Sequence, residues 1–429
     1  IQIHLQQYAR KQESSGKIWY SHQHAAWTAM MWDVIESELP ELVGDNPAPF
    51  KGWGDINVDD SMVNAAAKHH KPDTFLQWIV ATADRVASGF EREEFKQYND
   101  AKDETKAGKN HFTARQLTLL EQISLKDENK QNRADMKWRY KLEPLTVQNL
   151  FPVKAEGYET DSKEKAQKEY KHLWQQFTKT LATIPKSHRK NWSLWLDHFD
   201  SAWGCFTQSI PSATAFNTKP EVSLYDHSRT TAAIATAIWR YHHESKHDEE
   251  IIRKKLSSFE RPDWDEDKIL LIQGDFYGIQ DFIFATGGDT QKKAARLLRG
   301  RSFYVSLLTE CAALKILESL SLPPTSQVIN AAGKFLIVAP NTLETKQKLK
   351  QVQAEFDEWF LKYTYGKSGI GFATIEASCN DFVSSGKGKE NRFKLLIEKL
   401  FGQLEAIKKQ RFNLCVENAP AIFTEYLDQ

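Results

Sequence analysis

The sequence predicts a multidomain α+β protein in which a largely helical N-terminal part precedes a smaller unit built around a β-sheet. Apolar residues recur at helical spacing through most of residues 1–95 and 192–245. From Lys268 onward, short apolar runs alternate with helical segments in the order β-α-β-β-α-β. The length of 429 residues agrees with roughly two to four domains.

Composition narrows the class of protein. The chain is 41% hydrophobic and 27% charged, with a mean hydropathy of -0.57, as expected of a soluble protein with apolar cores. Lys plus Arg and Asp plus Glu both total 57, so nucleic-acid binding would need a local basic face. No apolar run approaches the roughly 20 residues that span a bilayer. The cysteines lack zinc-type spacing and favour a reducing compartment, which predicts a cytoplasmic protein without a membrane partner; they are Cys205, Cys311, Cys379 and Cys415.

The N-terminal part reads as helices joined by polar segments. Ser21 is a plausible N-cap for a helix that carries His24 and Trp27 on its apolar face. A second helix follows Pro72, with its apolar stripe running from Phe75 to Ala87. Polar or charged composition predicts an exposed insertion at 96–115, a charged region over 126–190 and a linker at 245–267.

The C-terminal part alternates strands and helices. We expect a buried strand at Ile269–Ile272 that ends in a turn at Gly274-Asp275, a helix at Ser302–Leu317, strands at Gln327–Asn330 and Phe335–Ala339, a helix at Leu349–Tyr363 and a strand at Ile370–Ala377. This order is the ferredoxin-like pattern shared by polymerase palms and nucleotide cyclases. A basic helix over 391–410 ends the pattern.

One group of residues has the composition of a metal site, because imidazoles and a carboxylate from several helices can share an ion. The candidate ligands are His24, His69, His70 and Asp84. Asp84 lies at the edge of an apolar stripe, where an unpaired carboxylate is costly. Alternatively, Asp84 pairs with Arg85 or Arg92 and the histidines are surface residues. Asp226-His227 lacks further ligands nearby in sequence and is a weak candidate for a second metal site.

A second group suits nucleotide binding. A strand followed by a glycine-containing turn into a helix offers backbone N–H groups to phosphate, and Asp275 is placed to hold Mg²⁺. The candidate residues are Gly274, Asp275, Phe276, Gly278 and Gln280. The alternative is an ordinary turn between a strand and a helix.

Basic residues follow this turn and favour contact with the phosphates of ATP or RNA. They are Lys292, Lys293, Arg296, Arg299 and Arg301. Arg299 and Arg301 are the stronger candidates because they flank Gly300, whereas a solvated helix start explains Lys292 and Lys293 equally well.

Active palms place paired carboxylates on a β-hairpin, where they hold two metal ions. The predicted hairpin here is Asn330-Ala331-Ala332-Gly333-Lys334, which has no carboxylate. Gly287-Gly288-Asp289 lies instead in a predicted loop. We therefore expect a palm that cannot bind the catalytic metal pair by itself.

Several segments together resemble the large subunit of type III-A CRISPR effector complexes, over its N-terminal half. His69-His70 and Ala83–Gly89 resemble the second half of its HD nuclease domain, and Pro211–Thr214 with Val222–Ala235 resemble the segment that joins HD and palm domains. Gly274–Ile283 and Leu298–Tyr304 resemble its first palm, which favours type III-A over III-B. The His-Asp pair that names the HD domain is not in this chain, so it either lies upstream or has been lost.

The resemblance implies a helical HD-like domain at 1–95, a charged insertion and the remainder of the N-terminal region at 96–191, a helical linker at 192–267, a first palm at 268–390 and the start of a further helical domain at 391–429. It implies single-stranded DNA cleavage with a transition metal such as Mn, Ni or Co. It also implies half of the ATP cleft, with Mg or Mn, for cyclic oligoadenylate synthesis. The implied partners are CRISPR RNA, target RNA and other effector subunits. The alternative is a non-catalytic scaffold subunit of the same ribonucleoprotein.

Overall fold

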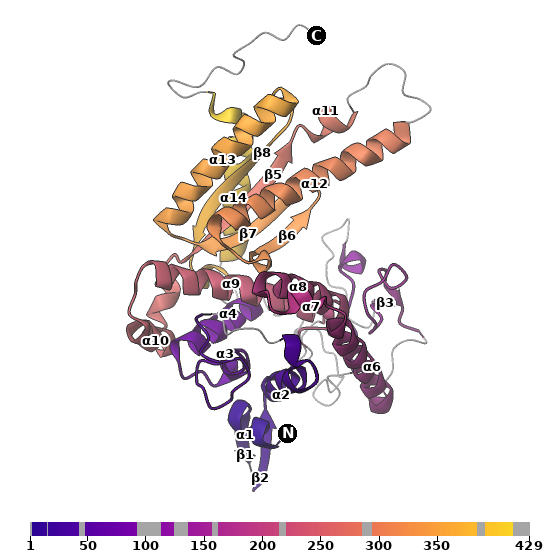
Figure 1. Cartoon of the computed structure of the whole chain (residues 1–429), viewed down its shortest axis with the longest axis vertical. Helices are drawn as coiled ribbons and strands as arrows, with labels where there is room; N and C mark the ends of the chain where they lie inside the picture. The colour runs from indigo at the N-terminus through magenta and orange to yellow at the C-terminus, as the bar shows by residue number, and fades with distance from the viewer. Residues whose placement is uncertain are drawn as a thin grey trace. The chain divides into compact units, whose positions relative to one another are not determined.

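The computed structural model describes residues 2–14, 16–42, 48–91, 113–123, 136–156, 162–213, 220–284, 294–383 and 391–414. The chain forms two compact units. Unit 1 comprises Ile1–Ala232, Asp248–Arg261 and Gly386–Gly388, and unit 2 comprises Ala233–His247, Pro262–Ser385 and Lys389–Gln429. Unit 1 is mainly helical and unit 2 contains a four-stranded sheet, so the predicted α+β class is confirmed (Figure 1).

Unit 1 begins with α1 (Gln2–Tyr8), a hairpin of β1 (Arg10–Ser14) and β2 (Lys17–Ser21), and α2 (Gln23–Glu38). The hairpin corrects the expectation of helix throughout 1–95. Strand β1 is polar, the apolar residues of β2 are consecutive and do not alternate, and Gly16 turns the chain with φ +74. Ser21 is not the N-cap, since His22 occupies that position in a left-handed conformation.

Three further elements complete the first part of unit 1. They are α3 (Met62–Ala67), the 3-10 helix η2 (Lys68–His70) and α4 (Phe75–Glu91). Ser61 caps α3 by accepting a hydrogen bond from the Asn64 backbone at 3.3 Å. Because η2 follows α3 directly, His69 and His70 lie at a fixed position relative to the buried face of α3.

The remainder of unit 1 contributes to an aromatic core. Trp32, Trp53, Trp195, Phe177 and Phe199 contact one another in edge-to-face and stacked pairs. The elements are η4 (Leu119–Gln122), β3 (Trp138–Arg139), β4 (Val153–Lys154), α6 (Lys163–Ala182), α7 (Lys186–Arg189), α8 (Trp192–Thr207), the first part of α9 (Leu224–Glu244) and α10 (Glu249–Ser257).

Two polar segments differ from their prediction. The expected linker at 245–267 contains α10, which buries Ile252 and Leu256 and contacts α4. Most of the predicted insertion at 96–115 lies outside the described residues. Its last residue, Arg115, is buried and pairs with Glu169, so this end of the segment belongs to the folded unit.

Unit 2 is organised around an antiparallel sheet with the strand order β6-β7-β5-β8. The strands are β5 (Ile269–Tyr277), β6 (Gln327–Ala331), β7 (Lys334–Pro340) and β8 (Gly369–Ala377), and the helices are α11 (Ile279–Phe284), α12 (Ala294–Leu320), α13 (Leu343–Thr364) and α14 (Arg392–Lys409). The predicted β-α-β-β-α-β order is present, with α11 as an additional short helix.

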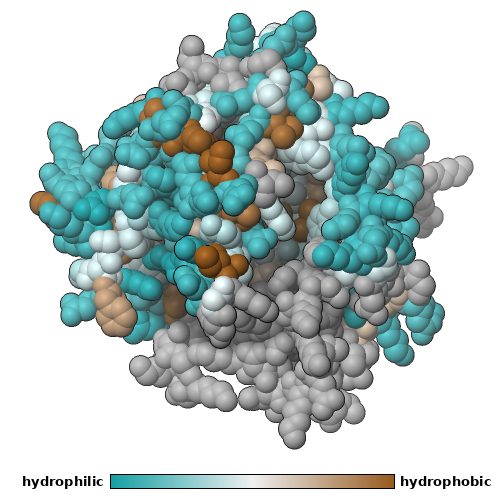
Figure 2. Space-filling view, turned by 90° about the horizontal axis from the view of Figure 1, so that it is seen from below, coloured by the Kyte–Doolittle hydropathy of each residue, from teal (hydrophilic) through white to brown (hydrophobic). Residues whose placement is uncertain are grey.

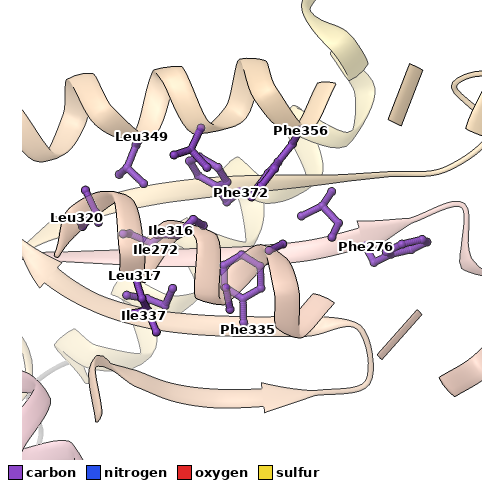
Figure 3. Packing of buried hydrophobic residues seen from close by; sticks show 14 of the residues in the cluster. Ile272, Phe276, Ile316, Leu317, Leu320, Phe335, Ile337, Leu349, Phe356 and Phe372 are labelled. Carbon is purple, nitrogen blue, oxygen red and sulfur yellow. The ribbon is translucent and has the colours of Figure 1, made fainter. Parts of the chain in front are cut away.

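The core of unit 2 lies between the sheet and the helices α12 and α13. Ile272 and Ile337 from the strands meet Ile316 and Leu317 from α12 and Leu349 from α13 (Figure 3). Helix α14 contacts β5 and β8, and its buried residues Leu400 and Leu404 do not belong to this cluster. The alternation of side chains along β5 therefore divides its residues between two environments.

Two boundaries in unit 2 correct the prediction. Strand β5 continues through Gly274 and Asp275 to Tyr277, and every residue of it is buried. The turn comes later, at Gly278, whose φ is +77. Helix α12 begins at Ala294 rather than at Ser302, so it includes Arg296, Arg299 and Arg301, which were expected to precede it.

Figure 2 shows one face of the molecule, on which hydrophilic residues predominate and hydrophobic ones form small groups between them. Among the described residues, none of the helices combines the length and apolar character needed to cross a bilayer.

The ring of Phe335 packs closely against the backbone of Gly274 in the core of unit 2, and this contact gives a stability prediction. A Cβ atom at this position would lie 2.0 Å from Cζ of Phe335. We expect Gly274→Ala to lower the free energy of unfolding by about 1–3 kcal/mol, as overpacking does, measured by thermal unfolding. Adding Phe335→Leu should recover part of the loss. Gly402→Ala is the control, because nothing lies within 4 Å of its added methyl group. If Gly274→Ala and Gly402→Ala changed the free energy of unfolding equally, overpacking against Phe335 would not be the cause.

Asp357 on α13 gives a pH prediction. Burial raises its pKa to about 6, while Gln353 Nε2 donates a hydrogen bond to its Oδ1 at 2.9 Å. The folded state thus binds more protons than the unfolded state between about pH 4 and 6, so stability falls as pH rises through this window. Asp357→Asn should stabilise by about 1–2 kcal/mol near pH 7.5 and by almost nothing near pH 4.

Thermal unfolding at both pH values measures this difference. The exposed neighbour Glu358→Gln serves as the control. A gain in stability for Asp357→Asn that is the same at both pH values would show that ionisation of Asp357 is not its cause.

Candidate metal centre and nucleotide-binding edge

Three imidazoles from two parts of unit 1 converge. His24 Nε2 on α2 lies 3.2 Å from His69 Nε2 and 2.7 Å from His70 Nε2 on η2. One nitrogen of each of the three rings lies within 4.8 Å of the others. Neutral imidazole nitrogens this close must share a proton or a cation, because their lone pairs otherwise face each other.

The local fold orients two of these rings. His69 Nδ1 lies 2.7 Å from the carbonyl oxygen of Ala66. Donation to that carbonyl places the proton on Nδ1 and leaves the Nε2 lone pair facing the other imidazoles. The His22 ring packs beside His70, with a centroid distance of 4.1 Å. The sequence prediction did not include His22, although it precedes His24 by only two positions.

Asp84 lies beside this cluster and has an unexpected partner. His227 Nε2 on α9 lies 3.2 Å from Asp84 Oδ1. Among the described residues, Asp84 thus pairs with His227 rather than with Arg85. The other predicted alternative, Arg92, lies outside the described residues. Sequence reasoning discounted His227 because 143 positions separate it from Asp84. Asp226 points elsewhere and accepts a hydrogen bond from Ser223 Oγ, whose own oxygen caps the start of α9.

The pKa shifts in this cluster favour protonation states that can bind a cation. The His24 side chain reaches the surface, yet desolvation of its ring among the other imidazoles lowers its pKa to about 4, and His69 adds to the effect. Desolvation and His69 also lower the pKa of His70. Burial alone would raise the pKa of Asp84, but the hydrogen bond to His227 and the charge of His69 lower it to about 2. The lowered pKa values of His24 and His70 favour their neutral forms and that of Asp84 favours its ionised form, as metal ligation requires.

One of the two measured spacings fits an ion. Ligand nitrogens about 2.0–2.1 Å from a tetrahedral metal lie about 3.3 Å from one another, close to the 3.2 Å between His24 and His69. The 2.7 Å between His24 and His70 is shorter, so one of these rings would have to shift for both to bind the same ion. Asp84 would serve as a further ligand or as a partner that orients one.

The residues of unit 2 that were predicted to bind a nucleotide lie in different environments. Gly274 and Phe276 belong to the core, where Gly274 lies under Phe335 and Phe276 is 2% exposed. Gly278 and Gln280 lie at the end of β5 and the start of α11. The expectation that all of them share one turn was wrong, because β5 remains paired with β8 as far as Tyr277.

Asp275 is buried and surrounded by cations. Its Oδ2 lies 2.6 Å from Lys408 Nζ on α14 and 3.8 Å from Lys334 Nζ at the start of β7. Partial burial alone would lower the pKa of Lys408, but hydrogen bonds to Asp275 and Glu405 raise it. The sequence prediction placed Mg²⁺ on Asp275, whereas the structure places two ammonium groups there. Lys408 was missed because it lies in a helix that was not considered part of this site.

The predicted hairpin is present and its tip lies beside the turn after β5. Ala332 and Gly333 both have positive φ, of 54° and 80°, as a two-residue hairpin turn requires. A Cβ on Gly333 would lie 3.0 Å from Ile279 Cδ1. This end of the sheet therefore brings together Gly278, the hairpin tip and the lysines beside Asp275.

The basic cluster lies on α12 and does not form a compact site. Arg296 and Arg299 are exposed, and Arg299 Nε donates to Ala295 O at 3.2 Å. Arg301 Nη1 donates to Ile283 O at 3.0 Å. Gly300 has no neighbour within 4 Å of an added Cβ, so the approach of a phosphate to the backbone there stays a prediction. Lys292 and Lys293, like Gly287–Asp289, lie outside the described residues.

Comparisons with known proteins agree on one family. Residues 268–425 match the family model described as Csm1 subunit domain B. A relative from Enterococcus italicus, the CRISPR system single-strand-specific deoxyribonuclease Cas10/Csm1 (subtype III-A), is 32% identical over 232 residues, or 53% of this chain and 30% of the relative. The protein of the same description from Methanocaldococcus jannaschii is 29% identical over 358 residues, or 79% of this chain and 41% of the relative.

Solved structures share the fold. A Csm1-Csm4 cassette in complex with one ATP has a TM-score of 0.60 and 22% identity, covering 92% of this chain and 46% of that chain. The cassette in complex with cA4 has a TM-score of 0.60 and 20% identity, covering 96% and 47%. This chain thus spans less than half the length of these relatives. Taken together, the matches show that the chain is similar to part of the Cas10/Csm1 proteins of subtype III-A CRISPR systems, and that residues 268–425 correspond to Csm1 subunit domain B.

Proposed function

We propose that this chain is part of the large subunit of a type III-A CRISPR effector that acts in antiviral defence. Unit 1 would contribute an HD-type, metal-dependent centre that cleaves single-stranded DNA. Unit 2, with its ferredoxin-like strand order, would be the first palm and supply half of an ATP-binding cleft for cyclic oligoadenylate synthesis. The partners would be CRISPR RNA, target RNA and other effector subunits in the cytoplasm.

The observation that carries the nuclease proposal is the convergence of His24, His69 and His70 beside Asp84. A bound transition metal would supply Lewis-acid activation of water at this site. The chain's own groups would hold the ion through Nε2 atoms, with Ala66 O fixing the His69 tautomer and His227 fixing Asp84. Both relatives are described as single-strand-specific deoxyribonucleases, which supports the choice of substrate.

For unit 2 we propose nucleotide binding without catalysis by this chain alone. The related cassettes were crystallised with ATP and with cA4, which supports ATP as the ligand. In this chain the hairpin Asn330–Lys334 lacks carboxylates, and Asp275 is neutralised by Lys334 and Lys408. Phosphoryl transfer at a palm requires carboxylates that hold metal ions. We therefore assign this unit to holding the nucleotide, with Lys334 facing its phosphates.

The contacts of Lys334 and Lys408 with Asp275 also favour a second function for unit 2. A palm whose acid is held by two lysines can also serve as a scaffold that keeps the fold without binding nucleotide. The two functions differ in one measurable respect, since only the nucleotide-holding palm binds ATP once the acid-bearing partner domain is supplied.

The metal site makes a direct prediction. Metal-free protein titrated with Mn²⁺, Co²⁺ or Ni²⁺ should bind one ion per chain in isothermal titration calorimetry, and a His69→Ala/His70→Ala variant should lose this binding. His227→Gln should weaken binding by about 10–100-fold, as loss of an orienting partner does. His172→Ala is the control, because His172 lies exposed on α6. Unchanged stoichiometry in the double variant would show that the ion binds elsewhere.

The palm gives a second prediction. Purified chain incubated with ATP and Mg²⁺ or Mn²⁺ should yield no oligoadenylate by mass spectrometry. ATP should bind weakly, and Lys334→Ala should reduce the affinity while Lys346→Ala, which pairs with Glu376, should not. Oligoadenylate that disappears in Asp275→Ala would overturn the half-site assignment. Absence of ATP binding even with the acid-bearing domain present would favour the scaffold.

A further inference from the structure

The first turns of α9 are held from one side and contact the candidate metal centre from the other. This part of the helix, like α4 and α8, belongs to unit 1. Tyr225 and Arg229 contact Asp200 on α8, whereas His227 contacts Asp84 on α4. Because successive helical residues are about 100° apart, Tyr225 and Arg229 share one side of α9, and His227 lies on roughly the opposite side. The orientation of His227 therefore depends on how α8 holds α9.

Asp200 is the acceptor that joins α8 to α9. Its Oδ2 accepts hydrogen bonds from Arg229 Nη1 at 3.0 Å and from Tyr225 Oη at 3.3 Å. Arg229 Nη1 also donates to Tyr225 Oη, so each of the three side chains contacts the other two. The side chain of Asp200 is 19% exposed and that of Arg229 is 21% exposed. Because both are largely shielded from water, this contact holds α9 more firmly than a surface ion pair would.

The ring of Tyr225 is also packed against the backbone of α8. Gly204 lies one turn after Asp200 on this helix, and a Cβ atom on Gly204 would lie 3.1 Å from Tyr225 Cε2. The missing side chain thus lets the ring lie close to the helix while its hydroxyl reaches Asp200. A side chain that is fixed at both its ring and its hydroxyl cannot shift without moving the helix that carries it.

The start of α9 is anchored separately. Leu224 N donates to Ile210 O at 2.7 Å, and Ser223 Oγ caps the helix by accepting a hydrogen bond from Asp226 N at 2.9 Å. These contacts oppose sliding of α9 along its own axis. Rotation about the axis is the motion that would carry His227 sideways, and the contacts with α8 on the opposite side of the helix oppose that rotation.

We propose that Asp200 is a positioning residue, which fixes the rotation of α9 through Tyr225 and Arg229 and thereby keeps His227 Nε2 on Asp84. This inference rests on the proposed metal centre, because Asp84 oriented by His227 is the carboxylate beside the imidazole cluster. Asp200 acts through His227 and is not itself a ligand. Its removal would let α9 rotate, so Asp84 would lose the partner that orients it and the cluster would bind an ion less tightly.

The first measurement needs no metal. Asp84→Asn, His227→Gln and their double variant are compared by the midpoint of thermal unfolding of the full chain, with Asp200 present and with Asp200→Ala. With Asp200 present, the double variant should shift the midpoint by less than the sum of the two single shifts, because both single variants lose one shared contact. With Asp200→Ala, the shifts should add. Non-additivity that survives Asp200→Ala unchanged would overturn the proposal, as would additive shifts with Asp200 present.

Metal affinity is the second readout. In isothermal titration calorimetry, Asp200→Ala should bind Mn²⁺ or Co²⁺ about tenfold more weakly, the lower end of the effect of losing an orienting partner. Added to His227→Gln, Asp200→Ala should cause no further loss, because its effect passes through that imidazole. Equal losses in the wild-type and His227→Gln backgrounds would show that Asp200 acts by another route, which contradicts the positioning role.

Two further variants separate positioning from general destabilisation. Tyr225→Phe keeps the packed ring and removes only the hydroxyl that contacts Asp200, so it should weaken metal binding less than Asp200→Ala does. Glu41→Gln breaks another carboxylate–arginine pair of unit 1, that of Glu41 with Arg189, and should change neither the additivity nor the affinity. If Glu41→Gln matched Asp200→Ala in both measurements, loss of stability would explain the result and the positioning role would be wrong.

Failure of this inference differs from failure of the proposed metal centre. If Asp200→Ala changes neither measurement while the wild-type chain binds one ion, the metal centre stands and the positioning role falls. If the wild-type chain binds no ion, the metal centre falls, and the metal-free comparison alone still decides whether Asp200 holds His227 on Asp84.

Discussion

The close packing of α2 against α3 and η2 is the constraint on which the candidate metal centre depends. Ala25, Ala26 and Ala29 on α2 are fully buried, and α2 contacts both α3 and η2. Small side chains let two helices approach closely, so the side chain of His24 reaches the rings of the 3-10 turn. Larger residues at these alanines would separate the helices and move His24 away from its partners, whatever the identity of the ligands.

In unit 2 the corresponding constraint is the two-residue period of β5. Because successive side chains point to opposite faces, Gly274 and Phe276 serve the core whereas Asp275, between them, faces the lysines of β7 and α14. A residue can therefore lie within a motif that resembles a nucleotide site and still be required only for packing. The motif as a string of letters does not distinguish these roles, but the strand period does.

Much of the fold and the three imidazoles were predictable from sequence. The features that were not predicted have identifiable physical reasons. Helical periodicity located α2 and α4, and apolar runs located the four strands of unit 2. The β1-β2 hairpin was missed because β1 is polar and the apolar residues of β2 are consecutive and do not alternate. Gly274-Asp275 was predicted to be a turn because both residues favour turns. His227 was missed for another reason: its contact with Asp84 spans 143 positions, and only tertiary packing of α9 creates it.

The carboxylates of the two candidate sites, Asp84 and Asp275, have different kinds of partner. Asp84 has a histidine partner, which can give up its proton and leave the carboxylate available to a metal ion. Asp275 has lysine partners, and Lys408 holds its proton more tightly because of this contact, so a metal ion would have to displace a permanent charge. A carboxylate beside histidines can exchange its partner for a metal ion, whereas one beside lysines keeps the lysines in place. The chemistry of the neighbouring cation therefore supports our proposal that a metal ion binds in unit 1, whereas in unit 2 it supports a role for Asp275 in positioning lysines.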